Sequence, residues 1–369
     1  MSHNATVSLA ERLAARIAEG GPLRFDDFQR AALYDPDGGY YEREGRVGRG
    51  GDFVTGASWH PAFARSLLRV AARLREELGE PLALADVGAG EGELLAYAAG
   101  ELEDPAWLRL AGVEASARRR AVAARRVPTA RWMGSLEELE PVRGLVVAYE
   151  LIDALPVRSL RMSESGELVE RRVAAGPDGF AWTEAICPDA AALLAVLAAR
   201  GAGLEPGQCL EIRPGAAAMA RALARRLSAG LLLIFDYGAP ARALYGPVRH
   251  RGTLEAFQGQ RVTRDVLAEP GSRDITAWVD FTELEEALLA EGLTVRGLVS
   301  QARLLLAAGL GDELRPADPE RPETAAAAAE RNAIGKLVAP GGMGEEIRVL
   351  VAERGTSAGA GLMRLPGLT

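Results

Sequence analysis

The chain has 369 residues, 48% of them hydrophobic and 25% charged, as expected of a globular protein with a sizeable core. Its net charge of −8 argues against a nucleic-acid partner, which calls for a basic face. The cysteines, Cys187 and Cys209, form no CxxC pair and no zinc-ligand pattern, so we expect no metal. No apolar run reaches transmembrane length and the N-terminus has no signal-peptide core, so we expect a cytoplasmic protein without membrane attachment. Abundant Ala, Arg and Gly with few Lys indicate a GC-rich, bacterial genome.

The N-terminal third is predicted to be mainly helical. Apolar spacing predicts helices over Ser8–Glu19 and Pro61–Leu78, and another that begins with Asp26 and Asp27 as N-caps and runs to Leu33. Between the last two lies GRVGRGGDFVTGASWHPAF, which is glycine-rich yet aromatic. Such a segment is typical of a lid or a binding loop.

A glycine motif follows this region. Leu82–Val87 is a short apolar run that predicts a buried strand, and Gly88, Gly90 and Gly92 come directly after it. Leu94 then opens a helical stretch. A strand, a glycine turn and a helix form the first half of a nucleotide-binding β-α-β unit, although an ordinary structural loop is an equal alternative from these residues alone.

Acidic residues around the motif favour S-adenosylmethionine (SAM) over a dinucleotide such as NAD. Glu91 and Glu93 in the first helical turn would repel a diphosphate, whereas SAM carries a sulfonium and an ammonium. Asp86 at the strand end is placed to accept a hydrogen bond from the methionine amine. Glu114 closes the next strand, Leu108–Glu114, where a carboxylate accepts from both ribose hydroxyls.

The rest of the chain predicts a doubly wound parallel sheet with an insertion. Further strands are expected at Thr129–Met133, Gly144–Tyr149 and Gly230–Asp236, with Ile347–Glu353 as the last, edge-ward strand. The segments between Val157 and Ile186 are separated by glycine turns and indicate an antiparallel meander. Helices are expected at Ser116–Arg126, Met219–Leu227, Asp280–Glu291 and Glu323–Leu337, and a long irregular stretch runs from Tyr245 to Asp280.

Two carboxylates follow the strand Gly144–Tyr149. Glu150 and Asp153 lie three residues apart, so they project to one side of a turn. Paired acids can hold a guanidinium, and one of them can accept the proton that leaves during methyl transfer. The alternative, that Asp153 caps a helix and Glu150 is a rim charge, has equal weight. His60 is a candidate base, but a hydrogen-bonded structural histidine is the stronger interpretation.

These motifs together resemble the MidA family of SAM-dependent methyltransferases, which includes the mitochondrial complex I assembly arginine methyltransferase. The resemblance runs from about Phe25 to Glu353. It is carried by LYDPDGGYY, GDFVT, VGAGEGEL, YELIDALPV, DYG, RGTLEAF, DITAWVDF and MGEEIRVL, in that order.

The resemblance implies an α/β fold, a class I SAM-methyltransferase (Rossmann-like) seven-stranded sheet with an N-terminal helical cap and an inserted antiparallel subdomain. We expect the cap and a SAM-covering loop at residues 1–80, the core at 81–355 with the substrate-facing insertion at 157–205, and a flexible tail at 356–369. The implied cofactor residues are Gly51, Asp52, Phe53, Thr55, Asp86, Gly88, Gly90, Glu114, Ser135 and Leu136. Glu150 and Asp153 would be catalytic, and the residues expected to contact the acceptor are Tyr149, Pro156, Trp59, His60 and Tyr237.

The family's activity implies methylation of a protein arginine. Where the family reads Ser-Pro-Glu after GDFxT, this chain reads Gly56-Ala57-Ser58, so a peptide or small natural product is an alternative acceptor. A further alternative is a non-catalytic assembly factor that binds SAM. The sequence leaves the number of methyl groups transferred open, as well as the choice between a monomer and a homodimer.

Overall fold

The computed structural model describes residues 7–42, 56–259, 261–315 and 323–364. The chain forms two compact units, each assembled from three separate stretches. The cap unit comprises Met1–Phe53, Asp153–Ala216 and Ala239–Thr282. The sheet unit comprises Val54–Ile152, Ala217–Gly238 and Glu283–Thr369. Among the described residues, no helix combines the length and apolarity needed to cross a bilayer.

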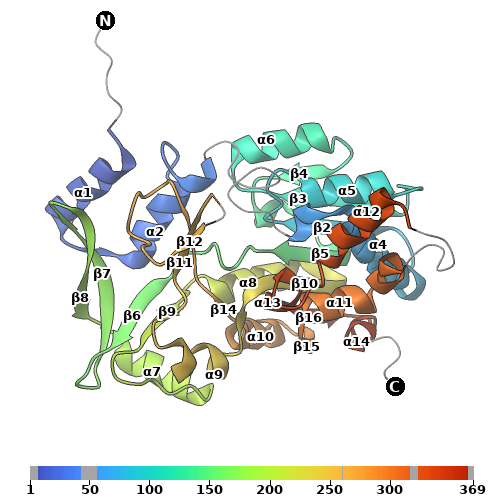
Figure 1. Cartoon of the computed structure of the whole chain (residues 1–369). Helices are drawn as coiled ribbons and strands as arrows, with labels where there is room; N and C mark the ends of the chain where they lie inside the picture. Colours follow the sequence, from blue (N-terminus) through green and yellow to red (C-terminus); the bar gives the residue numbers. More distant parts are fainter. Residues whose placement is uncertain (1–6, 43–55, 260, 316–322, 365–369) are drawn as a thin grey trace, which may run out of the picture. The chain divides into compact units, whose positions relative to one another are not determined.

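The sheet unit is built on strands in the order β15-β16-β10-β5-β2-β3-β4 (Figure 1). The bounds are β2 Leu82–Val87, β3 Leu108–Val113, β4 Arg131–Met133, β5 Val142–Tyr149, β10 Leu227–Ala239, β15 Thr294–Ser300 and β16 Ile347–Arg354. β4, β3, β2, β5 and β10 run parallel, whereas β16 is antiparallel to both β10 and β15. β2, β5 and β10 are almost continuous apolar runs, as expected for strands buried on both faces.

Helices of the sheet unit pack apolar faces against this sheet. They are α3 Gly56–Trp59, α4 Pro61–Leu78, α5 Glu93–Glu101, α6 Ala117–Arg126, α8 Ala216–Arg226, α10 Phe281–Ala290, α11 Gln301–Ala307, α12 Ala325–Gly335, α13 Met343–Glu346 and α14 Gly359–Leu362. α4 begins with Pro61 at its first position and buries Phe63 and Leu67 in a cluster with Leu145 and Leu233. Proline suits this start because the first helical N–H has no partner within the helix.

The cap unit combines two N-terminal helices with antiparallel strands. α1 Leu9–Gly20 and α2 Phe25–Tyr34 precede a sheet of β1 Leu23–Arg24, β6 Arg158–Met162, β7 Leu168–Gly176, β8 Gly179–Ile186 and β9 Cys209–Ile212. A second sheet has the order β12-β11-β13, with bounds Arg261–Thr263, Glu255–Gln258 and Asp274–Thr276. The unit also contains α7 Ala190–Ala199, α9 Ala241–Leu244 and β14 Val279–Asp280. Phe25 and Phe28 pack in one apolar cluster with Ala256 and Ile275.

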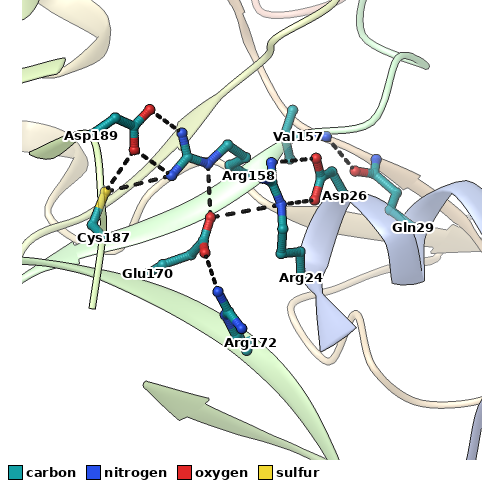
Figure 2. A network of polar contacts seen from close by, with 9 residues as sticks. All are labelled: Arg24, Asp26, Gln29, Val157, Arg158, Glu170, Arg172, Cys187 and Asp189. Carbon is teal, nitrogen blue, oxygen red and sulfur yellow. Dashed lines mark hydrogen bonds and ion pairs between the residues drawn. The ribbon is translucent and has the colours of Figure 1, made fainter. Parts of the chain in front are cut away.

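A buried ion cluster ties the meander of the cap unit together (Figure 2). Arg158 on β6 donates to Glu170 on β7 at 2.8 Å, and it also donates to both carboxylate oxygens of Asp189 at 2.6 and 2.8 Å. Arg172 also donates to Glu170, which is almost fully buried. Direct pairing compensates here for the burial of the charges. Removal of one partner would leave a buried charge without that partner and would lower the stability of the fold.

Several expectations need correction. Asp26 and Asp27 lie inside the first turn of α2, whose N-cap position is Arg24. The stretch between Tyr245 and Asp280 is not irregular, since it contains β11 to β14. β16 is not at the edge, because the unpredicted strand β15 lies outside it.

The compact units also divide differently from the expected regions. Residues 54–80 group with the sheet unit because the apolar face of α4 packs into its core. Residues 239–282 group with the cap unit because β11 and β13 pack against α2. Within the tail expected to be flexible, Gly359–Leu362 form α14 and Leu362 is buried.

Candidate active site

The glycine motif forms a tight loop between β2 and α5 in the sheet unit. Gly88, Gly90 and Gly92 have φ angles of +81°, +57° and +81°, a region that glycine adopts without strain. A Cβ on Gly88 would lie 2.9 Å from the Leu151 side chain, and a Cβ on Gly92 would lie 2.9 Å from Trp132. A Cβ on Gly90 would meet no atom within 4 Å. The loop is therefore packed on two sides and open at Gly90.

Glu114 is fixed beside this loop by backbone donors. Its Oε2 accepts from the Gly90 N–H at 2.9 Å, and its Oε1 accepts from the Ser116 N–H at 2.8 Å. A carboxylate oxygen can accept more than one hydrogen bond, so these two contacts are compatible with a further bond from a diol. This orientation fits the predicted ribose-binding role.

Asp86 is a buried acid in β2, only 4% exposed. Burial, and then the negative charges of Glu93 and Glu114, raise the pKa of Asp86 to about 7. A ligand ammonium next to it would favour the charged form. The side chain therefore suits the methionine amine of SAM.

Glu91 and Glu93 repel a negatively charged ligand less strongly than the sequence indicates. Arg126 on α6 forms an ion pair with Glu93 and donates to the carbonyl of Glu91 at 2.8 Å. Arg126 thus offsets part of the negative charge of this turn.

Ser135 and Leu136 follow β4, at the same sheet edge as Asp86 and Glu114. β2, β3 and β4 are adjacent and parallel, so their carboxyl ends meet at one edge, where ligands of such sheets bind. Leu136 is buried at the start of a short 3-10 helix, and Ser135 precedes it. The adenine contact of Ser135 and Leu136 stays a prediction.

The turn after β5 is strained and anchored. Glu150 has a φ angle of +47°, which is uncommon for a residue with a side chain, and its N–H donates to the Phe235 carbonyl at 2.9 Å. Asp236, fully buried in β10, accepts from the Ile152 N–H at 2.9 Å. The sequence marked Asp236 only as an acid at a strand end. The structure shows that it holds the turn that carries Glu150.

Asp153 begins the second stretch of the cap unit and is 8% exposed. Its Oδ2 accepts from the Thr276 hydroxyl at 3.1 Å, and its carbonyl accepts from Arg213 at 3.1 Å. Burial raises the pKa of Asp153, while Arg213 and Thr276 oppose this effect. Pro156, three residues later, is also buried.

Polar residues that the sequence did not single out as ligand-binding lie near Asp153 in the cap unit. The Tyr41 hydroxyl donates to Asp274 at 2.9 Å, and the Tyr34 hydroxyl donates to the Ala154 carbonyl at 2.7 Å. The rings of Tyr34 and Tyr41 are 5.4 Å apart. The tyrosine-rich motif was a signal for these residues, but their partners 120 or more residues away were not readable from sequence.

Tyr149 is a core residue of the sheet unit. Its ring stacks on Phe235 at 5.2 Å and its hydroxyl donates to Gln301 at 2.7 Å. Tyr149 is 7% exposed, whereas Tyr237 on β10 is only partly buried. Tyr149 thus has a structural role in the core, and the acceptor contacts predicted for Tyr149 and Tyr237 stay predictions.

Trp59 and His60 also make structural contacts. The indole of Trp59 donates to the Ala333 carbonyl at 2.8 Å. His60 is the N-cap of α4: its Nδ1 accepts from the Ala62 N–H at 3.2 Å, and its Nε2 lies 3.1 Å from a carboxylate oxygen of Glu330. Both ring nitrogens are thus engaged, which agrees with the structural interpretation of His60.

The predicted SAM-covering residues Gly51, Asp52, Phe53 and Thr55 lie outside the described residues. Within the described part of the chain, no group of three or more His, Cys, Asp or Glu side chains could hold a metal ion.

Comparison with known proteins decides the family. Residues 62–299 match the family model described as "Putative S-adenosyl-L-methionine-dependent methyltransferase". This chain belongs to that family. The protein is therefore a SAM-dependent methyltransferase, and SAM is its cofactor.

Curated relatives and a solved structure agree with this assignment. The chain is 24% identical over 347 residues to the protein arginine methyltransferase NDUFAF7 of Xenopus tropicalis, covering 84% of this chain and 77% of that protein. The Drosophila melanogaster homologue is 27% identical over 308 residues, covering 74% and 68%. A methyl transferase-like protein from Burkholderia thailandensis, bound to S-adenosyl-homocysteine, is 32% identical with a TM-score of 0.81, covering 95% and 92%.

The geometry of the methyltransferase site fits this cofactor. Asp86 suits the amine, Glu114 suits the ribose and the open backbone at Gly90 leaves room for close approach. The predicted α/β fold with a methyltransferase sheet and the predicted MidA-like family are thus confirmed.

Proposed function

We propose that this methyltransferase modifies a nitrogen of a protein arginine, with Glu150 and Asp153 as the acceptor-binding acids. The observation that carries the proposal is the acid pair itself: Glu150 is held in a strained turn, and Asp153 is buried three residues later. A guanidinium presents five N–H donors in a fork, which two carboxylates can satisfy together. Names of the curated relatives, which are protein arginine methyltransferases, support the same acceptor.

When bound, SAM supplies a methyl group whose carbon–sulfur bond breaks as the acceptor nitrogen bonds to the carbon, with the electron pair left on sulfur. The leaving proton of that nitrogen goes to the Asp153 carboxylate. Burial raises the pKa of Asp153, which makes the carboxylate a better base than an exposed aspartate. Glu150 contributes negative charge that keeps the guanidinium oriented.

The altered segment Gly56-Ala57-Ser58, which motivated a different acceptor, is buried in the sheet unit. A Cβ on Gly56 would lie 2.2 Å from the Tyr149 hydroxyl, so glycine here serves packing. Arginine is therefore the acceptor we carry forward, and methylation of a hydroxyl group is an outcome of the test.

The test is transfer of labelled methyl from SAM to a panel of arginine peptides, with matched peptides in which lysine replaces arginine and with hydroxylated acceptors. We expect label only on the arginine peptides. Asp153→Asn should lower turnover about 100-fold or more and leave SAM affinity nearly unchanged. The exposed Asp312→Asn is the control variant and should behave as wild type. Retained turnover in Asp153→Asn, or label on the hydroxylated acceptors alone, would contradict the proposal.

A further inference from the structure

The Asp153 carboxylate is held by a residue far away in sequence. Thr276 lies at the end of β13, 123 residues further along the chain, and its hydroxyl donates to Asp153 Oδ2 at 3.1 Å. This hydrogen bond fixes one carboxylate oxygen and favours the ionised form, because an ionised oxygen is the stronger acceptor.

Arg213, just after β9, anchors the backbone on both sides of this hydrogen bond. Its guanidinium donates to the carbonyls of Asp153 and Leu155 at 3.1 and 3.0 Å. It also donates to the carbonyls of Ala277 and Trp278, at 2.7 and 3.2 Å. Arg213 is 4% exposed, so a buried cation connects the Asp153 segment to the segment that follows Thr276. Its charge also lowers the pKa of Asp153, against the effect of burial.

Other titratable groups face Asp153 from neighbouring elements of the cap unit. Tyr41, in the short helix Tyr40–Glu42, is electrostatically coupled to Asp153 and donates to Asp274 on β13. Burial, followed by the charge of Asp274, keeps the pKa of Tyr41 well above its ordinary value, so the phenol stays neutral. Tyr34 on α2 donates to the carbonyl of Ala154. Among these groups, Arg213 favours ionisation of Asp153, and Asp274 accepts the hydrogen bond of Tyr41.

We propose that Thr276 is a positioning residue for methyl transfer, which holds the Asp153 carboxylate oriented and ionised while Arg213 fixes the two backbone segments that carry the pair. The proposal rests on the proposed function, in which Asp153 receives the proton of the acceptor nitrogen. Thr276 itself has no contact with reacting atoms in this scheme and acts only through Asp153.

The direct test is the titration of Asp153, which needs no acceptor. Carboxyl ¹³C signals of aspartate-labelled full-length protein are followed against pH, and Asp153→Asn identifies the signal by its loss. In Thr276→Val, which keeps the shape but removes the hydroxyl, the Asp153 midpoint should move to higher pH. In Thr276→Ser, which keeps the hydroxyl, the midpoint should return toward wild type. Thr263→Val is the matched control, because the Thr263 hydroxyl on β12 accepts from the Asp265 N–H at 3.1 Å, and its loss should leave the midpoint unchanged.

Activity on an arginine peptide provides the second readout. In Thr276→Val the acidic limb of the pH–turnover profile should move to higher pH than in wild type, because less Asp153 is ionised at a given pH. An unchanged midpoint in Thr276→Val, with methylation of the peptide intact, would overturn the positioning role and leave the proposed function standing. A shifted midpoint without methylation of any arginine peptide would support the role of Thr276 and refute arginine as the acceptor.

Discussion

Asp86 predicts a pH dependence of cofactor affinity that can be measured without an acceptor. Its pKa of about 7 means that about one side chain in ten is ionised at pH 6 and about nine in ten at pH 8. If the ionised carboxylate binds the SAM amine, SAM should bind about tenfold more weakly at pH 6 than at pH 8, with a correspondingly larger dissociation constant. The sign follows from the direction of the shift: the charge that attracts the ammonium is lost as the pH falls through 7.

Titration calorimetry at several pH values tests this with two controls. Asp86→Asn carries no titrating group, so its SAM affinity should vary little between pH 6 and pH 8 and be about ten- to a hundredfold weaker than wild type at pH 8. Methylthioadenosine has the adenosine part without the amine, so its affinity should not change with pH in either protein. Equal slopes for SAM in wild type and Asp86→Asn would refute the assignment of Asp86 to the amine.

Three further substitutions separate ligand contacts from structural ones. Glu114→Gln should weaken SAM binding about tenfold in calorimetry and cost about 1–3 kcal/mol in unfolding free energy, because one of its two backbone donors then faces an amide NH2; unchanged affinity would argue against ribose binding. Tyr149→Phe removes the hydroxyl that donates to Gln301, so chemical denaturation should show a loss of about 1–2 kcal/mol while SAM affinity is retained, and a selective loss of acceptor binding would support the predicted acceptor contact of Tyr149. Arg158→Leu removes the shorter of the two arginine hydrogen bonds to the buried Glu170 and should cost about 3 kcal/mol in unfolding free energy, whereas wild-type stability would show that the cluster is dispensable.

The sheet and its ligand edge were predictable because their signals are local. Apolar runs marked β2, β5 and β10, and the glycines and acids after the strands marked the loop and Glu114. In a parallel sheet the carboxyl ends meet at one edge, so a position in sequence translates directly into a position in space. The predicted helix Pro61–Leu78 has the same bounds in the structure for a similar reason, since its apolar face and its proline are both readable.

Contacts between distant segments were not predictable. The pair of Asp153 and Thr276, and the four carbonyls that Arg213 binds, join stretches about 60 to 120 residues apart. β11 was missed because Glu255–Gln258 has only four residues, two of them polar, and its pairing decides its structure. The role of His60, in contrast, was readable from the sequence. A polar residue directly before Pro61 indicates an N-cap, but His60 was predicted to contact the acceptor instead.

The place of β16 in the sheet has a consequence for synthesis of the chain. This strand, Ile347–Arg354, is the last in sequence, yet it lies between β10 and β15 rather than at the rim. Until this strand emerges from the ribosome, the edge of β10 that pairs with β16 has no partner strand. An unpaired edge of a strand rich in apolar side chains tends to pair with other chains. A nascent or truncated polypeptide that stops just before Ile347 should therefore depend on chaperones to avoid aggregation.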